Sequence, residues 1–133
     1  MNPFSIFNIS SDAAFEKKAI EVFKFQFENN RVYRSFCDLL YKHPSDVHSI
    51  KDIPFLPVEF FKSHKVLSSD KHIQKTFVSS GTTNSIPSQH HITDLEVYKK
   101  SFTKGFEKFY GAFKRFTILA LLPSYLDRED SSL

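Results

Sequence analysis

The sequence predicts an α/β protein: a helical hairpin at the N-terminus, followed by a partial sheet with covering helices. Three observations predict it. Apolar residues recur at helical spacing over residues 12–42, two short extended segments flank a hydroxyl-rich loop within residues 77–91, and residues 116–122 form a continuous apolar run. A length of 133 residues allows about one domain.

The helical hairpin is predicted from two amphipathic stretches, about Asp12–Glu28 and about Arg31–Lys42. Asn29 and Asn30 separate them, and Pro44 lies just beyond the second, where proline is tolerated. The apolar residues that define the two faces are Phe15, Ala19, Val22, Phe23 and Phe27 in the first helix and Val32, Phe36, Leu39 and Leu40 in the second.

The middle of the chain is rich in proline, so its regular elements are expected to be short. "IPFLPVEFF" predicts an extended segment and then one helical turn begun by Pro57. "QKTFVSS" and "QHHIT" predict two strands on either side of the loop. The loop is therefore expected to join two strands.

The last third of the chain predicts a helix and then a strand. "TDLE" fits a capping box in which Thr93 begins the helix and Glu96 reaches back, and Gly111 provides the stop. "FTILALL" then reads as a strand buried on both faces, as in a parallel sheet covered by helices. Such a strand needs neighbours, so we expect a truncated piece of a larger α/β protein. The helix's expected core face is Leu95, Tyr98, Phe102, Phe106 and Phe109.

Composition excludes several classes of function. A net charge of +3 with scattered cations lacks the basic stripe of a nucleic-acid surface. The longest apolar run is far shorter than the roughly 20 residues that span a bilayer, and the N-terminus lacks the pattern of a secretory signal. A single cysteine, Cys37, fits a reducing compartment, so a cytoplasmic protein without a membrane span is expected.

The loop "FVSSGTTNSIPSQHH" combines many hydroxyls with one glycine. Hydroxyls and backbone N–H groups in a tight turn bind anions such as phosphate, and Gly81 allows close approach of the backbone. The common phosphate loop GxxxxGK[ST] is absent, and a hydroxyl-rich loop is often a simple surface connection. The hydroxyl-bearing residues are Ser79, Ser80, Thr82, Thr83, Ser85 and Ser88.

A family resemblance favours the phosphate interpretation. "SSGTT" after a short strand resembles the phosphate loop of the adenylate-forming superfamily, which includes acyl-CoA synthetases. The ordered blocks "DIPFLPVEFFKSHKVL", "TFVSSGTT", "HHITDLEVYKKSF" and "ILALLPSYLDREDSSL" resemble the N-terminal part of the acyl-protein synthetase family, LuxE-like. The resemblance covers residues 50–133, which would be the first part of the adenylate-forming domain, truncated at residue 133. Residues 1–49 form a separate helical segment, expected to cap that domain or contact a partner subunit.

The resemblance implies that ATP and a carboxylic acid, a fatty acid above all, form an acyl-adenylate whose acyl group passes to a thiol. Ser79, Ser80, Gly81, Thr82 and Thr83, with Asn84 after them, would hold the outer phosphates of ATP, and Mg²⁺ would share their charge. Tyr125 would border the acyl pocket, or simply cover a strand end. The catalytic residues are expected beyond Leu133, so the chain alone is expected to be inactive.

Two departures from the superfamily pattern bear on how tightly the loop binds phosphate. Asn84 stands where relatives carry a second glycine, and Pro87 is followed by Ser88 rather than by lysine. Either His90 or another cation replaces that lysine, or the loop holds phosphate more weakly than its relatives do.

Other interpretations stay open. In one, the chain is a non-catalytic α/β interaction module whose loop is only a turn and whose phenylalanine faces bind a protein. A nucleic-acid surface is disfavoured by the weak charge. His90 and His91 do not suggest a metal site, because neighbouring strand residues point to opposite faces. Cys37 is expected to be structural, since it falls inside the second predicted helix beside its apolar face, and the family's acyl-accepting cysteine is expected beyond Leu133.

Overall fold

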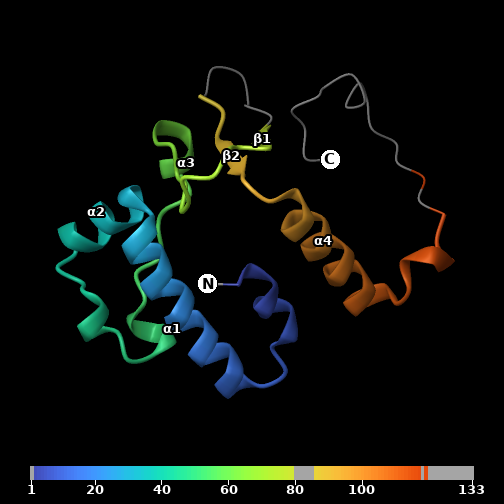
Figure 1. Cartoon of the computed structure of the whole chain (residues 1–133), viewed down its shortest axis with the longest axis horizontal. Coiled ribbons are helices and arrows are strands. Elements are labelled where there is room, and N and C mark those ends of the chain that lie inside the picture. Colours follow the sequence, from blue (N-terminus) through green and yellow to red (C-terminus); the bar gives the residue numbers. More distant parts are fainter. Residues whose placement is uncertain (1, 80–85, 118, 120–133) are drawn as a thin grey trace.

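The computed structural model of the protein describes residues 2–79, 86–117 and 119. Figure 1 shows a small β-hairpin of β1 (Lys75–Val78) and β2 (Gln89–Ile92) between two groups of helices. The helices α1 (Asp12–Asn29) and α2 (Arg31–Leu39) lie on one side, and α4 (Leu95–Tyr110) lies on the other. Helices combined with a sheet agree with the predicted α/β class, and these described residues form one antiparallel pair of strands.

Asn30 alone joins α1 to α2. Its backbone N–H donates to the carbonyl of Gln26 at 2.8 Å, which ends α1, and its side-chain oxygen accepts from the N–H of Tyr33 at 3.1 Å, which begins α2. The predicted break at Asn29 and Asn30 is confirmed. The second helix ends at Leu39, three residues before the predicted end at Lys42, and Tyr41 follows with a positive φ of 53°.

The hydrophobic core lies where α1 and α2 meet. Phe23 packs against Phe27 and, edge to face, against Tyr33, with ring centroids 6.3 and 6.1 Å apart. Cys37 is fully buried in this cluster, and burial raises the pKa of its thiol. The cluster, hereafter the hairpin core, consists of Phe23, Phe27, Tyr33, Cys37 and Val47.

The predicted face of the second helix is only partly confirmed: Val32 and Phe36 are half buried and Phe36 packs against the hairpin core, but the prediction was wrong for Leu39 and Leu40. Tyr33 and Cys37 are buried there, whereas Leu39 is 78% and Leu40 48% exposed. The Tyr33 hydroxyl donates to the carbonyl of Pro54 at 2.6 Å, and this bond helps to hold the Tyr33 side of α2 against the core. In the first helix Phe15 is likewise half exposed, at 52%.

The segment after α2 returns to the helical hairpin through 3-10 turns at Pro44–Asp46 and Ile50–Asp52. An extended stretch follows, and then the short helix α3 (Phe60–Ser63), where the N–H of Phe60 donates to the carbonyl of Pro57 at 3.1 Å. This confirms the predicted extended segment and helical turn. The Ser68 hydroxyl then bonds to Gln26, and the Asn30 amide donates to Ser68 at 3.2 Å.

We expect Asn30→Ala to lower the free energy of unfolding by about 1–2 kcal/mol, because it removes the α2 cap and the amide's bonds to Gln26 and Ser68. Asn30 is only 4% exposed. Urea denaturation followed by circular dichroism measures the change. The control is Asn29→Ala, whose exposed amide donates to the carbonyl of Phe25, and it should stay within about 0.5 kcal/mol of the wild type. Equal losses in both variants would contradict this account.

Asp94, rather than the predicted Thr93, caps α4. Its carboxylate accepts from the N–H groups of Glu96 and Val97 at 3.1 and 3.2 Å. A carboxylate at a helix N-terminus also interacts favourably with the helix dipole, which a hydroxyl does not. At the other end Gly111 has a φ of 85°, which confirms the predicted glycine stop.

The predicted core face of α4 is only partly covered. Tyr98 packs on Phe77 with ring centroids 4.9 Å apart, and Leu95 and Phe106 are half buried. Phe102 and Phe109, however, are 57% and 77% exposed, since the neighbours described for α4 are the β-hairpin, η1 (Pro3–Asn8) and the turn η4 (Phe113–Arg115). The predicted strand at 116–122 falls mostly outside the described residues, and its first two residues belong to no strand.

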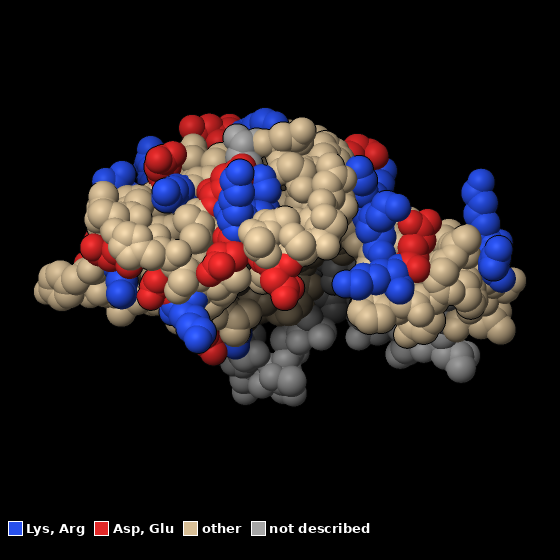
Figure 2. Space-filling view, turned by 90° about the horizontal axis from the view of Figure 1, so that it is seen from below, with Lys and Arg blue, Asp and Glu red and all other residues tan. Residues whose placement is uncertain are grey.

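The surface mixes both signs of charge. On the face in Figure 2, lysine and arginine side chains alternate with acidic ones. Lys100 lies over the rings of Phe4 and Phe7 at 5.1 and 5.2 Å, which fixes η1 beside α4. Over the described part of the chain, we find no helix whose length and apolar character would allow it to cross a membrane.

Candidate functional site

The β-hairpin closes the base of the hydroxyl-rich loop. In the register of β1 and β2, Phe77 faces His90 and Thr76 faces His91, which confirms the two predicted strands. One step beyond the strands, the N–H of Ser79 donates to the carbonyl of Ser88 at 3.0 Å, and the N–H of Ser88 donates to the Ser79 hydroxyl oxygen at 2.9 Å. The chain therefore enters and leaves the loop at a fixed pair of residues.

Ser79 is the one predicted phosphate ligand that the described residues include. Its hydroxyl oxygen accepts a bond from Ser88, and among the described residues its hydrogen has no acceptor, so it could donate to a phosphate. The other predicted ligands and the predicted acyl-pocket residue lie outside the described residues: Ser80, Gly81, Thr82, Thr83, Asn84 and Tyr125.

One face of the hairpin forms a small hollow of about 240 Å³ beside the loop base. Phe77, Ser79, Ser88 and His90 line it together with Tyr98 of α4. His90 also contacts the ring of Phe61 edge to face, with centroids 5.9 Å apart. The histidine named as a substitute for the missing lysine thus shares this hollow with both serines of the loop base.

His91 has different partners. Its Nδ1 lies 2.9 Å from the hydroxyl oxygen of Thr76, the residue opposite it in β1. Burial is the main cause that lowers the pKa of His91 below its ordinary value, and the positive charge of Lys65 lowers it further. Both effects favour the neutral form of the ring.

This pKa predicts the sign of a pH effect on stability. Because the folded chain takes up the His91 proton less readily than the unfolded chain, the contribution is complete above the unfolded pKa of about 6.5 and is lost as pH falls below it. We expect the midpoint temperature of thermal unfolding to be lower at about pH 5.5 than at about pH 7.5. The decrease should be smaller in the variant His91→Asn. Identical drops in the two proteins would show that His91 does not contribute.

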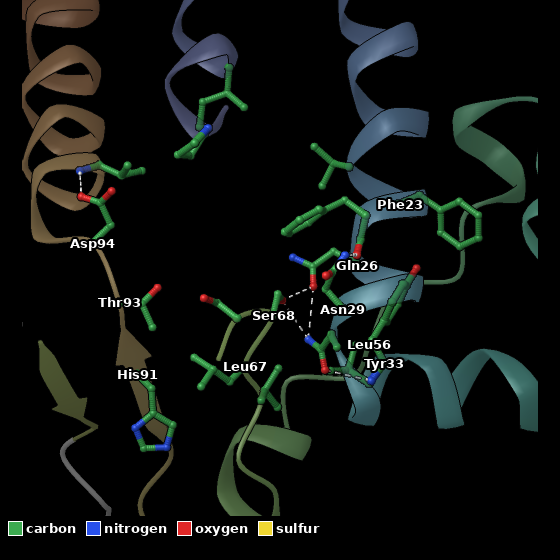
Figure 3. Close-up of a pocket in the computed structure, with 18 of the residues that line it drawn as sticks. Phe23, Gln26, Asn29, Tyr33, Leu56, Leu67, Ser68, His91, Thr93 and Asp94 are labelled. Atoms are coloured by element: carbon green, nitrogen blue, oxygen red, sulfur yellow. Dashed lines mark hydrogen bonds between the residues drawn. The ribbon is translucent and has the colours of Figure 1, made fainter. Parts of the chain in front are cut away.

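An open, mostly apolar cleft of about 1040 Å³ lies between α1 and the β2–α4 segment. Figure 3 shows Phe23, Leu56 and Leu67 on the helical-hairpin side of the cleft, and His91, Thr93 and Asp94 on the opposite side. The bonded cluster of Gln26, Asn30 and Ser68 lines the cleft on the helical-hairpin side. The cleft thus combines a mostly apolar lining with a few polar side chains, which suits a ligand that is mainly apolar.

Three features of this region were missed from sequence. Gln74 accepts from the N–H of Leu95 at 2.8 Å, which ties the start of α4 to β1. The bonds of Ser68 to Gln26 and Asn30 join residues about forty positions apart in the sequence. The cleft is likewise lined by segments that are far apart in the sequence. The sequence signal that could have indicated the cleft was the apolar face of the first helix, because Ala19 and Val22 of that face line the cleft.

A metal centre is not assembled by the described residues, among which no three His, Cys, Asp or Glu side chains are grouped to hold an ion. Binding of Mg²⁺ beside the phosphates of ATP therefore stays a prediction, and its protein ligands would have to lie outside the described residues.

Fold and site together define a helix-rich α/β protein with a hydroxyl-rich hairpin loop beside an apolar cleft. Residues 1–128 match the family described as acyl-protein synthetase, LuxE. The chain belongs to this family. The match includes residues 1–49, for which the sequence resemblance was less distinct.

Two curated relatives carry the name long-chain-fatty-acid–luciferin-component ligase. The protein of Photorhabdus luminescens is 32% identical over 75 residues, or 56% of this chain and 63% of that protein. The protein of Aliivibrio fischeri is 37% identical over 71 residues, or 50% of this chain and 18% of that protein. The chain thus covers less than two thirds of either relative, and no solved structure matches it significantly.

Proposed function

We propose that this chain supplies the phosphate-binding loop of an ATP-dependent ligase that activates a long-chain fatty acid as acyl-AMP. The proposal is supported by membership of the acyl-protein synthetase family and by relatives named as ligases of long-chain fatty acids. The observation that carries it is the loop base, where Ser79 and Ser88 bond to each other at the two ends of the loop that contains "SSGTT".

The proposed reaction has two steps. A carboxylate oxygen attacks the α-phosphorus of ATP, the bond to the β-phosphate oxygen breaks, and pyrophosphate leaves. A thiolate then attacks the acyl carbon, and AMP leaves with the electron pair of the mixed anhydride.

In this chain Ser79, Ser80, Gly81, Thr82 and Thr83 hold the outer phosphates by hydroxyl and backbone donors, which stabilises charge on the leaving pyrophosphate. His90, in the hollow with Ser79 and Ser88, is the candidate for the role of the absent lysine. Bound Mg²⁺ would supply further positive charge to those phosphates.

A pyrophosphate-exchange assay on the full-length protein tests the proposal. We expect exchange of labelled pyrophosphate into ATP that requires both ATP and a saturated acid such as tetradecanoate. The chain alone should show none, because the family's remaining catalytic residues are expected beyond Leu133. Absence of exchange with a broad panel of acids would contradict the proposal.

A second candidate function has one observation in its favour. Phe102 and Phe109 of α4 are largely exposed, as is expected of a surface that binds another protein. In this alternative the chain is a non-catalytic interaction module and its loop is only a turn. The Gly81 variant described in the Discussion separates the two functions.

A further inference from the structure

We infer that the cleft between α1 and the β2–α4 segment binds the hydrocarbon chain of the acid, with its carboxyl end toward the β-hairpin. The inference rests on the proposed function and adds a location for the acyl chain that the family assignment does not provide. Three observations carry it: the size of the cleft, the chemistry of its two walls, and its continuity with the hairpin.

The size of the cleft suits a large apolar ligand. Its volume of about 1040 Å³ lies just above the range of about 300–1,000 Å³ usual for ligand sites. Most of its lining is hydrocarbon or aromatic. Side chains from α1, from the stretch after Ile53 and from the stretch before Ser68 contribute to it, including Val22, Phe23, Ile53, Leu56, Val66 and Leu67.

The two walls differ in chemistry. On the helical-hairpin side, the polar groups of Gln26, Asn30 and Ser68 bond to one another. The side-chain oxygen of Gln26, the amide nitrogen of Asn30 and the hydroxyl of Ser68 are therefore already bonded within the protein. On the opposite side, His91 and Thr93 of the β2–α4 segment border the cleft beside apolar Ile92 and Val97. A ligand with a long apolar tail and one polar end matches this distribution.

The cleft is continuous with the hairpin that carries the phosphate loop. His90 and His91 line the cleft, and Ser88, two positions before His90, closes the loop base. A carboxylate must reach the α-phosphate while its tail stays out of water, so an acyl site has to border the nucleotide site. Through β2, one strand borders both the loop base and this cleft.

Direct binding of fatty acids to the chain without ATP tests the inference. Isothermal titration calorimetry compares tetradecanoate with octanoate below their micelle-forming concentrations. We expect the affinity to rise about fourfold for each additional methylene that the cleft removes from water. Equal affinity for the two acids, or no binding of tetradecanoate, would overturn the inference.

Two variants locate the bound chain. Ala19→Trp on α1 and Val97→Trp on α4 place an indole in the cleft from opposite walls, and each should weaken tetradecanoate binding at least about tenfold. The matched control is Ala13→Trp, exposed on the same helix as Ala19 and outside the cleft, and it should bind like the wild type. Circular dichroism confirms that each variant is folded. Folded cleft variants that bind as tightly as Ala13→Trp would overturn the inference.

The remaining outcomes separate this inference from the proposed function. A concentration-dependent dimer that Ala19→Trp dissociates, without any acid binding, would assign the cleft to a second copy of the chain and overturn the inference. Pyrophosphate exchange in the full-length protein that is unaffected by Ala19→Trp with tetradecanoate would also overturn it, while the proposed function stands. Chain-length-dependent binding that both cleft variants weaken, without any exchange, would support the site and contradict the proposed function.

Discussion

Phe23→Ala is expected to lower the free energy of unfolding by about 3–5 kcal/mol, because it removes a buried ring and leaves a cavity. Phe23 is 2% exposed and contacts the rings of Phe27 and Tyr33 in the hairpin core. Native domains are stable by only about 5–15 kcal/mol, so this loss removes much of the total. Urea denaturation monitored by circular dichroism measures it.

The control for this prediction is Phe109→Ala. The same side chain is lost from a helix, but Phe109 is 77% exposed, so the free energy of unfolding should change by no more than about 0.5 kcal/mol. Comparable losses at the two positions would mean that the hairpin core does not dominate stability, and that the surface of α4 contributes as much.

If the proposed function holds, Gly81→Leu is expected to reduce the pyrophosphate exchange of the ligase about 100-fold or more, the effect of removing one donor to a developing oxyanion. The reason comes from the sequence: in a loop of hydroxyl residues the lone glycine lets the backbone N–H approach a phosphate closely, and a leucine side chain prevents it. Exchange and ATP affinity are both measured. The same substitution should leave unfolding largely unchanged, because the expected contacts are with ligand.

Gly105→Leu serves as the matched control for Gly81→Leu. A Cβ built on Gly105 of α4 meets nothing within 4 Å, so a side chain there is accommodated and exchange should match the wild type. If Gly81→Leu binds ATP as tightly as Gly105→Leu in a folded protein, the phosphate site is wrong and the interaction module gains support.

Much of the secondary structure could be predicted because it depends on neighbours in sequence. The break at Asn30, the strands at 75–78 and 89–92 and the stop at Gly111 follow from caps, alternation and glycine, and all were found. Which face of a helix is buried depends on distant partners. The Tyr33 bond to Pro54 helps to select a face of α2 that periodicity did not indicate, and the exposure of Phe109 reflects which elements pack on α4.

The candidate site divides in the same way. A hydroxyl-rich loop between two strands is visible in the sequence, and the bonds between Ser79 and Ser88 close it as the strand pattern predicts. The cleft could not be predicted, since η1, α1, the stretch around Leu56 and β2 are distant in sequence and meet only in the folded chain. The pattern "TDLE" predicts Thr93 as the helix cap, because a capping box and an aspartate cap one residue later look alike in sequence.

The burial of Cys37 also gives the chain a built-in reporter of conformational opening. It is the chain's only cysteine, it is fully buried, and its pKa is raised, so a thiol reagent reacts with it only when α2 separates from the hairpin core. The labelling rate therefore measures how often the N-terminal helices open. Since Phe23 belongs both to the hairpin core and to the lining of the cleft, a fatty acid bound there should slow that labelling.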